Sequence, residues 1–183
     1  KITDGILKFD NVDFSFASGL DAKNILSGIS FTIGPGKTLG IVGPPGSGKS
    51  TIAHLIPRFY DVSGGNITID NQDIRKVSLE SLRQFVSVIQ QDSFLFTASI
   101  ENNIAYGDPW SGGDRITVAN TSAQLHDYVA RLPLGYETLI GERGVSLSGG
   151  QRQRLSIARG IILKPGIIVF DDSTAAIDTG TEQ

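Results

Sequence analysis

Alternating apolar and polar residues in the first third of the chain predict short strands. The runs 12–16 and 29–33 alternate in this way, the run 6–9 is mostly apolar, and polar or glycine-rich residues separate the three runs. The run 38–42 is apolar almost throughout, which is typical of a strand covered on both faces. The sequence therefore predicts that the chain opens with several strands, the last of them buried.

A helical pattern follows the glycine-rich stretch 43–50. Apolar residues recur at helical spacing at Ile52, Leu55, Ile56 and Phe59. This segment therefore predicts a strand, a glycine loop and a helix in succession.

The middle of the chain predicts another strand, a short helix and a buried strand. The strand at 64–70 follows a glycine turn, and Ser78 is placed to cap a helix that runs to about residue 85. The apolar run 85–89 then predicts the buried strand.

From residue 92 to about residue 160 the strand pattern disappears. One helix is expected around Leu125 and Val129 and ends before Pro133, and another follows the stretch 147–151. The last strand is expected at 167–170. Strands alternating with helices, together with an all-helical insert, predict an α/β sheet that carries a helical subdomain.

Composition narrows the class of protein. The chain has 183 residues, 39% of them apolar and 19% charged, as expected of one globular domain. Its net charge of −3 provides no basic field for nucleic acid or an anionic membrane surface, and we see no apolar run long enough to span a membrane. Cysteine is absent, which excludes disulfides and thiolate metal sites. Methionine is absent too, so we expect either that the chain starts after a cut or that it is a domain excised from a longer protein.

The glycine-rich stretch carries the clearest chemistry. GPPGSGKS matches G-x-x-x-x-G-K-[ST] at every fixed position, with a predicted strand before it and a predicted helix after it. Its glycines let backbone N–H groups turn inward around phosphates, Lys49 supplies a charge to the β and γ phosphates, and Ser50 offers a hydroxyl to Mg²⁺. The residues assigned to nucleotide binding here are Gly43, Pro44, Pro45, Gly46, Ser47, Gly48, Lys49, Ser50 and Thr51.

Two adjacent acids, Asp171 and Asp172, follow the apolar run 167–170. In P-loop enzymes an acid at the end of a hydrophobic strand helps to hold Mg²⁺, which is the role expected for Asp171. The alternative is a helix cap after a strand. Side chains reverse direction at each step of a strand, so Asp172 is expected to reach toward an attacking water instead.

With LSGGQ at 147–151, between the glycine loop and the two acids, the chain resembles the nucleotide-binding domain of ATP-binding cassette (ABC) transporters. The resemblance implies a P-loop NTPase with a RecA-like, mostly parallel sheet core. It also implies an N-terminal antiparallel β-subdomain and an α-helical signature subdomain at approximately 92–160. Residues 1–183 would form one such domain, incomplete at its C-terminus, because the family continues to a further strand and a histidine.

The resemblance assigns roles to further residues. Gln91 matches the Q-loop glutamine, which contacts Mg²⁺ and water where the transmembrane domain docks. Phe16 falls where the family has an aromatic residue stacked on adenine, although a core strand position is the alternative. Asp178 matches the acidic position of the D-loop. The stretch 141–144 resembles the short loop before the signature motif that is typical of exporters.

The resemblance also implies how such a domain works. Two domains dimerise head to tail around ATP and Mg²⁺, and Ser148, Gly149, Gly150 and Gln151 of one domain contact the ATP of the other. The expected partners are a second nucleotide-binding domain, in a homodimer or heterodimer, and a transmembrane domain, with no nucleic acid. The expected location is the cytoplasmic face of a plasma or inner membrane.

The catalytic residues implied are Asp172, Gln91 and Lys49, and Asp172 departs from the glutamate usual in active members. Aspartate is shorter by about 1 Å, and a misplacement of about 1 Å can cost about 100-fold in rate. We therefore expect slow hydrolysis at this chain's own site. The alternatives are a homodimeric exporter in which Asp172 suffices, a non-hydrolytic regulatory module, and a non-transport ABC protein. The exporter-like stretch 141–144 and the lack of basic patches argue against the last.

Overall fold

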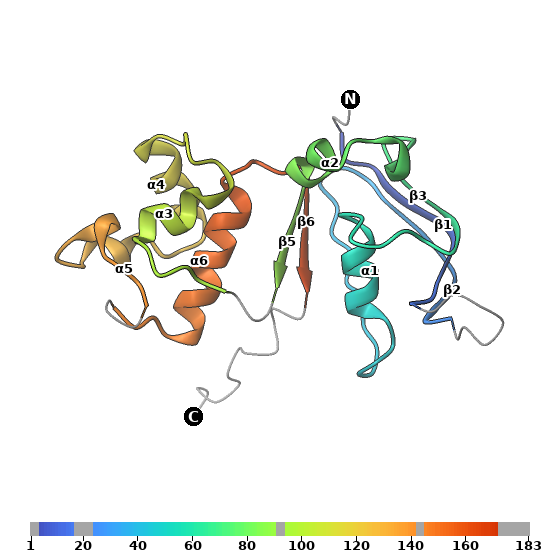
Figure 1. Cartoon of the computed structure of the whole chain (residues 1–183), viewed down its shortest axis with the longest axis horizontal. Coiled ribbons are helices and arrows are strands. Elements are labelled where there is room, and N and C mark those ends of the chain that lie inside the picture. The colour runs from blue at the N-terminus through green and yellow to red at the C-terminus, as the bar shows by residue number, and fades with distance from the viewer. Residues whose placement is uncertain (1–3, 17–23, 91–93, 142–144, 172–183) are drawn as a thin grey trace. The chain divides into compact units, whose positions relative to one another are not determined.

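The structure is a computed structural model that describes residues 4–16, 24–90, 94–141 and 145–171. The chain divides into two compact units, Lys1–Val86 and Ser87–Gln183. Figure 1 shows strands together with helices α1 and α2 in the first unit, and mainly helices in the second. Each unit is described by itself below.

Among its described residues, the first unit forms a four-stranded antiparallel sheet with the order β2-β1-β3-β4. Its strands are β1 (Leu7–Phe14), β2 (Leu26–Ile33), β3 (Gly64–Ile69) and β4 (Gln72–Asp73). The predicted antiparallel β-subdomain is confirmed.

The two runs predicted at 6–9 and 12–16 join into the single strand β1. The register shifts between Phe9 and Val12, where Asn11 has a φ of 48°. Apolar side chains before and after this bulge are separated by three positions rather than two, so a regular strand would send them to opposite faces. With the bulge, Phe9 and Val12 are both buried, at 1% and 0% exposure.

The helices of the first unit follow the predicted pattern. They are α1 (Lys49–Leu55), the 3-10 turn η1 (Ile74–Lys76) and α2 (Leu79–Phe85). Ile52 and Leu55 of α1 are buried, and the hydroxyl of Ser78 accepts a hydrogen bond from the N–H of Ser81. The predicted helix after the glycine loop and the predicted Ser78 cap are both confirmed, but α1 ends at Leu55, so Phe59 lies outside it and is 46% exposed.

The prediction of a buried strand at 38–42 is wrong for this structure. The segment lies outside every strand, and Leu39, Ile41 and Val42 are 44%, 42% and 94% exposed. A strand satisfies its backbone groups through neighbouring strands, and none of the described strands pairs with this segment. An apolar run alone does not supply those neighbours.

The second unit contains a two-stranded sheet of β5 (Val86–Gln90) and β6 (Ile167–Asp171), whose arrows run in the same direction in Figure 1. Both strands were predicted. Ile168 and Phe170 of β6 are 38% and 54% exposed, so this strand is only partly buried. The exposed residues Ile168 and Phe170 alternate with half-buried ones, so they share one face of β6, and that face is left uncovered.

Helices and turns make up most of the described chain between β5 and β6. They are α3 (Ile100–Ile104), η2 (Ala105–Gly107), α4 (Gly113–Ser122), α5 (His126–Ala130), η3 (Gly135–Glu137) and α6 (Gly149–Ile161). The helices predicted around Val129 and after 147–151 are confirmed, and the first of them ends before Pro133.

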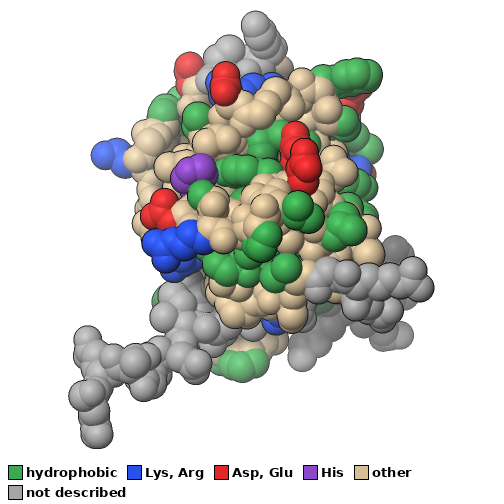
Figure 2. Space-filling view, turned by 90° about the vertical axis from the view of Figure 1, so that its left-hand side faces the viewer, with side chains coloured by type: hydrophobic (Ala, Val, Ile, Leu, Met, Phe, Trp, Pro, Cys, Tyr) green, Lys and Arg blue, Asp and Glu red, His purple; other side chains and the backbone are tan. Residues whose placement is uncertain are grey.

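The second unit has its own hydrophobic core, formed mainly by α3, α4, α5 and α6. Leu155 and Ala158 of α6 are both fully buried, as the helical spacing requires. Figure 2 views this unit from the side of α4 and α5, where exposed apolar side chains lie among charged ones. Over the described residues, every helix is too short or too polar to cross a bilayer.

Candidate functional site

The glycine loop at 43–50 is shaped by backbone conformations that favour glycine. Gly46 and Gly48 have φ values of 77° and 92°, and Gly48 is the cap residue from which α1 begins. The N–H of Ser47 donates to the carbonyl of Pro44 at 3.2 Å, which closes the turn. A side chain on Gly43 would lie 2.7 Å from the hydroxyl of Ser47. The loop therefore turns tightly on itself and leads directly into α1.

Lys49 lies across the start of this loop. Its ammonium donates to the carbonyls of Gly43 and Pro44 at 2.9 and 3.0 Å. Among the described side chains, no carboxylate pairs with Lys49, so its positive charge meets only neutral oxygens. Together with the exposed backbone of the loop and the N-terminal end of α1, this charge fits a phosphate chain.

Phe16 lies just after β1 and is 61% exposed. The alternative that it is a core strand residue is therefore wrong. Its ring packs edge-on against Phe14 and Tyr60, with centroid distances of 4.9 and 5.1 Å. These contacts hold the ring in place and leave much of it open to solvent, which suits a stacking platform.

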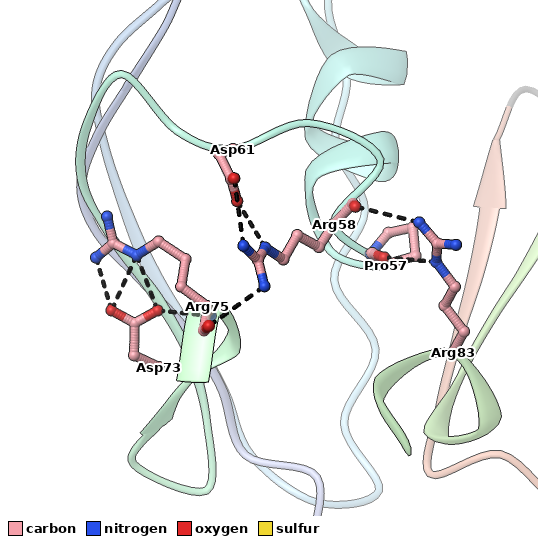
Figure 3. Close-up of polar contacts among 6 residues, drawn as sticks. All are labelled: Pro57, Arg58, Asp61, Asp73, Arg75 and Arg83. Atoms are coloured by element: carbon pink, nitrogen blue, oxygen red, sulfur yellow. Dashed lines mark hydrogen bonds and ion pairs between the residues drawn. The ribbon is translucent and has the colours of Figure 1, made fainter. Parts of the chain in front are cut away.

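A set of arginines, which no motif marks in the sequence, secures the far end of α1 (Figure 3). Arg83 of α2 donates to the carbonyls of Pro57 and Arg58, both at 3.4 Å. Its guanidinium also lies over the ring of Phe59, 5.4 Å from the centroid. Arg83 thus satisfies carbonyls that follow α1 and ties that helix to α2.

Two ion pairs continue this arrangement. Arg58 pairs with Asp61 at 2.6 Å and donates to the carbonyl of Arg75, which itself pairs with Asp73 at 2.6 Å. The hydrogen bond from Arg58 holds the pKa of the Asp61 carboxyl below its usual value, and Arg75 lowers the pKa of Asp73 in the same way. Both carboxylates therefore stay charged at neutral pH.

The N-terminus of α6 carries the LSGGQ stretch. The hydroxyl of Ser148 accepts from the N–H of Gln151 at 3.2 Å, while the Gln151 side chain accepts from the N–H of Ser148 at 2.8 Å. This reciprocal capping box satisfies N–H groups at the start of α6. Gly149 and Gly150 are exposed, and no atom lies within 4 Å of the place where a side chain on Gly150 would begin. The first turn of α6 is therefore open to a ligand.

Asp171 is the last residue of β6 and is half-buried. Because β5 and β6 run in parallel, the carboxyl ends of both strands, at Gln90 and Asp171, lie at the same edge of their sheet. Ligands of α/β proteins bind beyond this edge. The predicted site residues Gln91, Asp172 and Asp178 lie outside the described residues.

Two features define a P-loop nucleotide-binding domain. One is a glycine loop that ends in Lys49 and Ser50 and opens a helix, and the other is an acid at the carboxyl end of an apolar parallel strand. The predicted fold class is confirmed.

Comparison with known proteins identifies the family. The family described as "ABC transporter" matches residues 26–175, and the chain belongs to this family, as the motifs predicted. It is 48% identical over 179 residues to human ATP-binding cassette sub-family B member 6, covering 98% of this chain and 21% of that protein.

Two further comparisons agree. The chain is 47% identical to an ATM1-type heavy metal exporter of Novosphingobium aromaticivorans, covering 96% of this chain and 28% of the relative. Its fold matches a solved structure of a bacterial Atm1-family ABC exporter with ATP bound, with a TM-score of 0.88 and 45% identity, over 98% of this chain and 31% of that one. The chain thus spans roughly a fifth to a third of the length of these relatives.

Proposed function

We propose that this chain is the ATP-binding and ATP-hydrolysing motor domain of an ABC exporter. The observation that carries the proposal is Lys49, whose ammonium lies over the loop 43–50 with only neutral carbonyl partners among the described residues. A lysine held in this way is ready to bind an anionic phosphate chain. Relatives named as exporters, one of them solved with ATP bound, support the same conclusion.

Each part of the nucleotide has a proposed contact. The backbone of 43–50 and the side chain of Lys49 bind the phosphates, and Phe16 stacks on the adenine. Ser50, Asp171 and Gln91 hold Mg²⁺, which when bound neutralises charge that develops on the phosphates. In the described part of the chain, no three acidic or histidine side chains form a metal cluster. A Mg²⁺ ion held partly by phosphate oxygens and water fits so sparse a set of protein ligands.

The signature end of α6 serves a second domain. The hydroxyl of Ser148 and the open first turn at Gly149 and Gly150 present hydrogen-bonding groups at the positive end of a 13-residue helix. We infer that these groups and Gln151 bind the γ-phosphate of ATP held by the other domain of a head-to-tail dimer. Asp178 would connect the two sites across the dimer.

The surroundings of the domain follow from its relatives. Residues 1–183 form the nucleotide-binding domain, with a helical subdomain at approximately 92–160. Because two of these relatives are named as exporters and all three are about three to five times longer than this chain, we expect a transmembrane domain as partner. The domain would then lie at the cytoplasmic face of a plasma or inner membrane.

Asp172 sets the rate at which this domain hydrolyses its own ATP. Its carboxylate is one methylene shorter than the glutamate usual in the family, and a general base must lie about 2.6–3.2 Å from its proton donor. We propose slow hydrolysis at this site, with the intact LSGGQ completing the site of a partner. The shorter acid also favours a second candidate function, a regulatory module in which ATP closes the dimer without being hydrolysed. In the remaining alternative, a homodimeric exporter, Asp172 suffices as the base.

The test is the ATPase rate of the full-length gene product, alone and with its partner, for the wild type and for Asp172→Glu. If the short side chain of Asp172 limits hydrolysis, Asp172→Glu should have a much higher ATPase rate than the wild type. If Asp172→Glu and the wild type have equal ATPase rates in the complete protein, the length of the Asp172 side chain does not limit hydrolysis, and this proposal is contradicted. Lys49→Ala is the matched control, because its loss of the ammonium should abolish the activity of both versions.

A further inference from the structure

Phe16 lies beyond the part of β1 that is paired in the sheet. The pairing of β1 with β2 ends at Phe14 and Leu26, and Phe16 follows two residues later. Its side chain is 61% exposed, so the surrounding protein restricts it only in part. A ring in this position keeps one orientation only if neighbouring side chains select one rotamer. A residue proposed to stack on adenine therefore needs support from outside the strand pairing.

Two aromatic side chains provide this support. The ring centroids of Phe14 and Tyr60 lie 4.9 and 5.1 Å from that of Phe16, with interplanar angles of 85° and 84°. Phe14 and Tyr60 also contact each other, with their centroids 5.7 Å apart. Edge-to-face packing at such distances is a favoured arrangement of aromatic rings. The two contacts fix the orientation of the Phe16 ring without enclosing it.

The two supporting residues differ in their other roles. Phe14 belongs to β1 and is buried in the core of the first unit. Tyr60 comes from the segment after α1, 44 positions beyond Phe16 along the chain, and is 43% exposed. Replacing Tyr60 therefore removes a contact with Phe16 without opening the core, which makes its role measurable.

The segment that carries Tyr60 is fixed on both sides of this residue. Arg58 and Asp61 form a two-point ion pair around it, with Nε–Oδ1 and Nη2–Oδ2 distances of 2.6 and 3.3 Å (Figure 3). The N–H of Ser63 donates to a carbonyl of β1 at 2.9 Å, and its hydroxyl accepts from the N–H of Ser15 at 3.1 Å. These bonds hold the segment 58–63 against the end of β1.

We propose that Tyr60 is a positioning residue for the nucleobase, which fixes the ring of Phe16 so that Phe16 can stack on the base of a nucleotide bound at 43–50. This inference rests on the proposed function, in which Phe16 stacks on adenine. It adds a residue that no motif marks. Because the rings that Tyr60 contacts are those of Phe14 and Phe16, its effect falls on the base and not on the phosphates.

The experiment compares the equilibrium affinities of the full-length gene product for MgAMP-PNP and for magnesium tripolyphosphate, which has three phosphates but no base. Tyr60→Leu removes the ring and keeps an apolar side chain, whereas Tyr60→Phe keeps the ring. Phe59→Leu is the matched control, because the neighbouring ring of Phe59 contacts His54 and Arg83 instead. Both ligands are measured on the same preparation, so any loss of folded protein lowers the binding of both.

We expect Tyr60→Leu to bind MgAMP-PNP about threefold to tenfold more weakly than the wild type, as the loss of one edge-to-face contact implies. Its affinity for tripolyphosphate should stay within about twofold of the wild type, as should both affinities of Tyr60→Phe and Phe59→Leu. Because Tyr60 acts through Phe16, the double variant Phe16→Leu/Tyr60→Leu should bind MgAMP-PNP no more than about twofold more weakly than Phe16→Leu alone.

The inference is overturned if Tyr60→Leu binds MgAMP-PNP as the wild type does, if it loses affinity for both ligands equally, or if Tyr60→Phe or Phe59→Leu shows the same loss. Additive losses in the double variant would also overturn it, since Tyr60 would then act independently of Phe16. A wild type that binds both ligands equally would leave phosphate binding in place and overturn only the roles of Phe16 and Tyr60. A wild type that binds neither ligand would overturn the proposed function, and this inference with it.

Discussion

Gly48 offers the sharpest test of the loop geometry, through its substitution by alanine. This residue has a φ of 92°, and a Cβ there would lie 2.7 Å from Cδ2 of Leu26 and 3.4 Å from Cγ2 of Ile25. Leu26 is only 3% exposed, so it has little room to move. Gly48→Ala therefore combines an unfavourable backbone conformation with overpacking against β2.

The cost can be estimated from these two effects. A left-handed conformation costs an alanine about 1–2 kcal/mol, and overpacking of a well-packed site costs about 1–3 kcal/mol. We therefore expect Gly48→Ala to lower the free energy of unfolding by about 2–5 kcal/mol. Gly46 has a φ of 77° with no atom within 4 Å of its would-be Cβ, so Gly46→Ala should show the backbone cost alone.

The assay is urea denaturation followed by far-UV circular dichroism, which yields the free energy of unfolding for each variant. Gly34→Ala is the neutral control, because the site is open and its φ is not in the left-handed range; its effect should stay within about 0.5 kcal/mol. The expected order of destabilisation is Gly48, then Gly46, then Gly34. Equal losses for Gly48→Ala and Gly46→Ala would refute the predicted close contact with Leu26.

Three further predictions concern other parts of the chain. Ser148→Ala removes the acceptor for the N–H of Gln151 and should cost about 1 kcal/mol in urea unfolding, with Ser148→Asn close to the wild type. Leu155→Ala removes a fully buried side chain and should cost about 2–5 kcal/mol in the same assay, so a loss below 1 kcal/mol would contradict its core position. Asp73→Ala should be destabilising at pH 7, because Arg75 lowers the pKa of the folded-state carboxyl. That stabilisation is present above the unfolded-state pKa of about 4 and is lost as pH falls through the lower folded-state pKa, so the difference from the wild type should shrink there.

The sequence predicted those features that depend on local chemistry. The loop at 43–50 is set by residues within a few positions of each other, so its geometry follows from the motif. The helical spacing of Ile52 and Leu55 likewise predicted which side of α1 is buried.

Features that depend on distant partners were missed. The run 38–42 looks like a buried strand, but burial requires neighbouring strands that periodicity does not report. The bulge in β1 was read as a gap between two strands, because an apolar spacing of three breaks the alternation. Arg159 contacts Phe94 and Asn103, 65 and 56 positions away, and no short pattern predicts such pairs.

The most direct test of the central claim, that residues 43–50 bind ATP through Lys49, is the equilibrium affinity of the full-length gene product for MgATP. The wild type should bind saturably, and Lys49→Ala should bind about tenfold more weakly or worse, a loss of about 1.4 kcal/mol or more. The midpoint of thermal unfolding without nucleotide should be the same for the two proteins, because the Lys49 ammonium contacts only the carbonyls of its own loop. Equal affinity for MgATP in both proteins, or no saturable binding by the folded wild type, would contradict the claim.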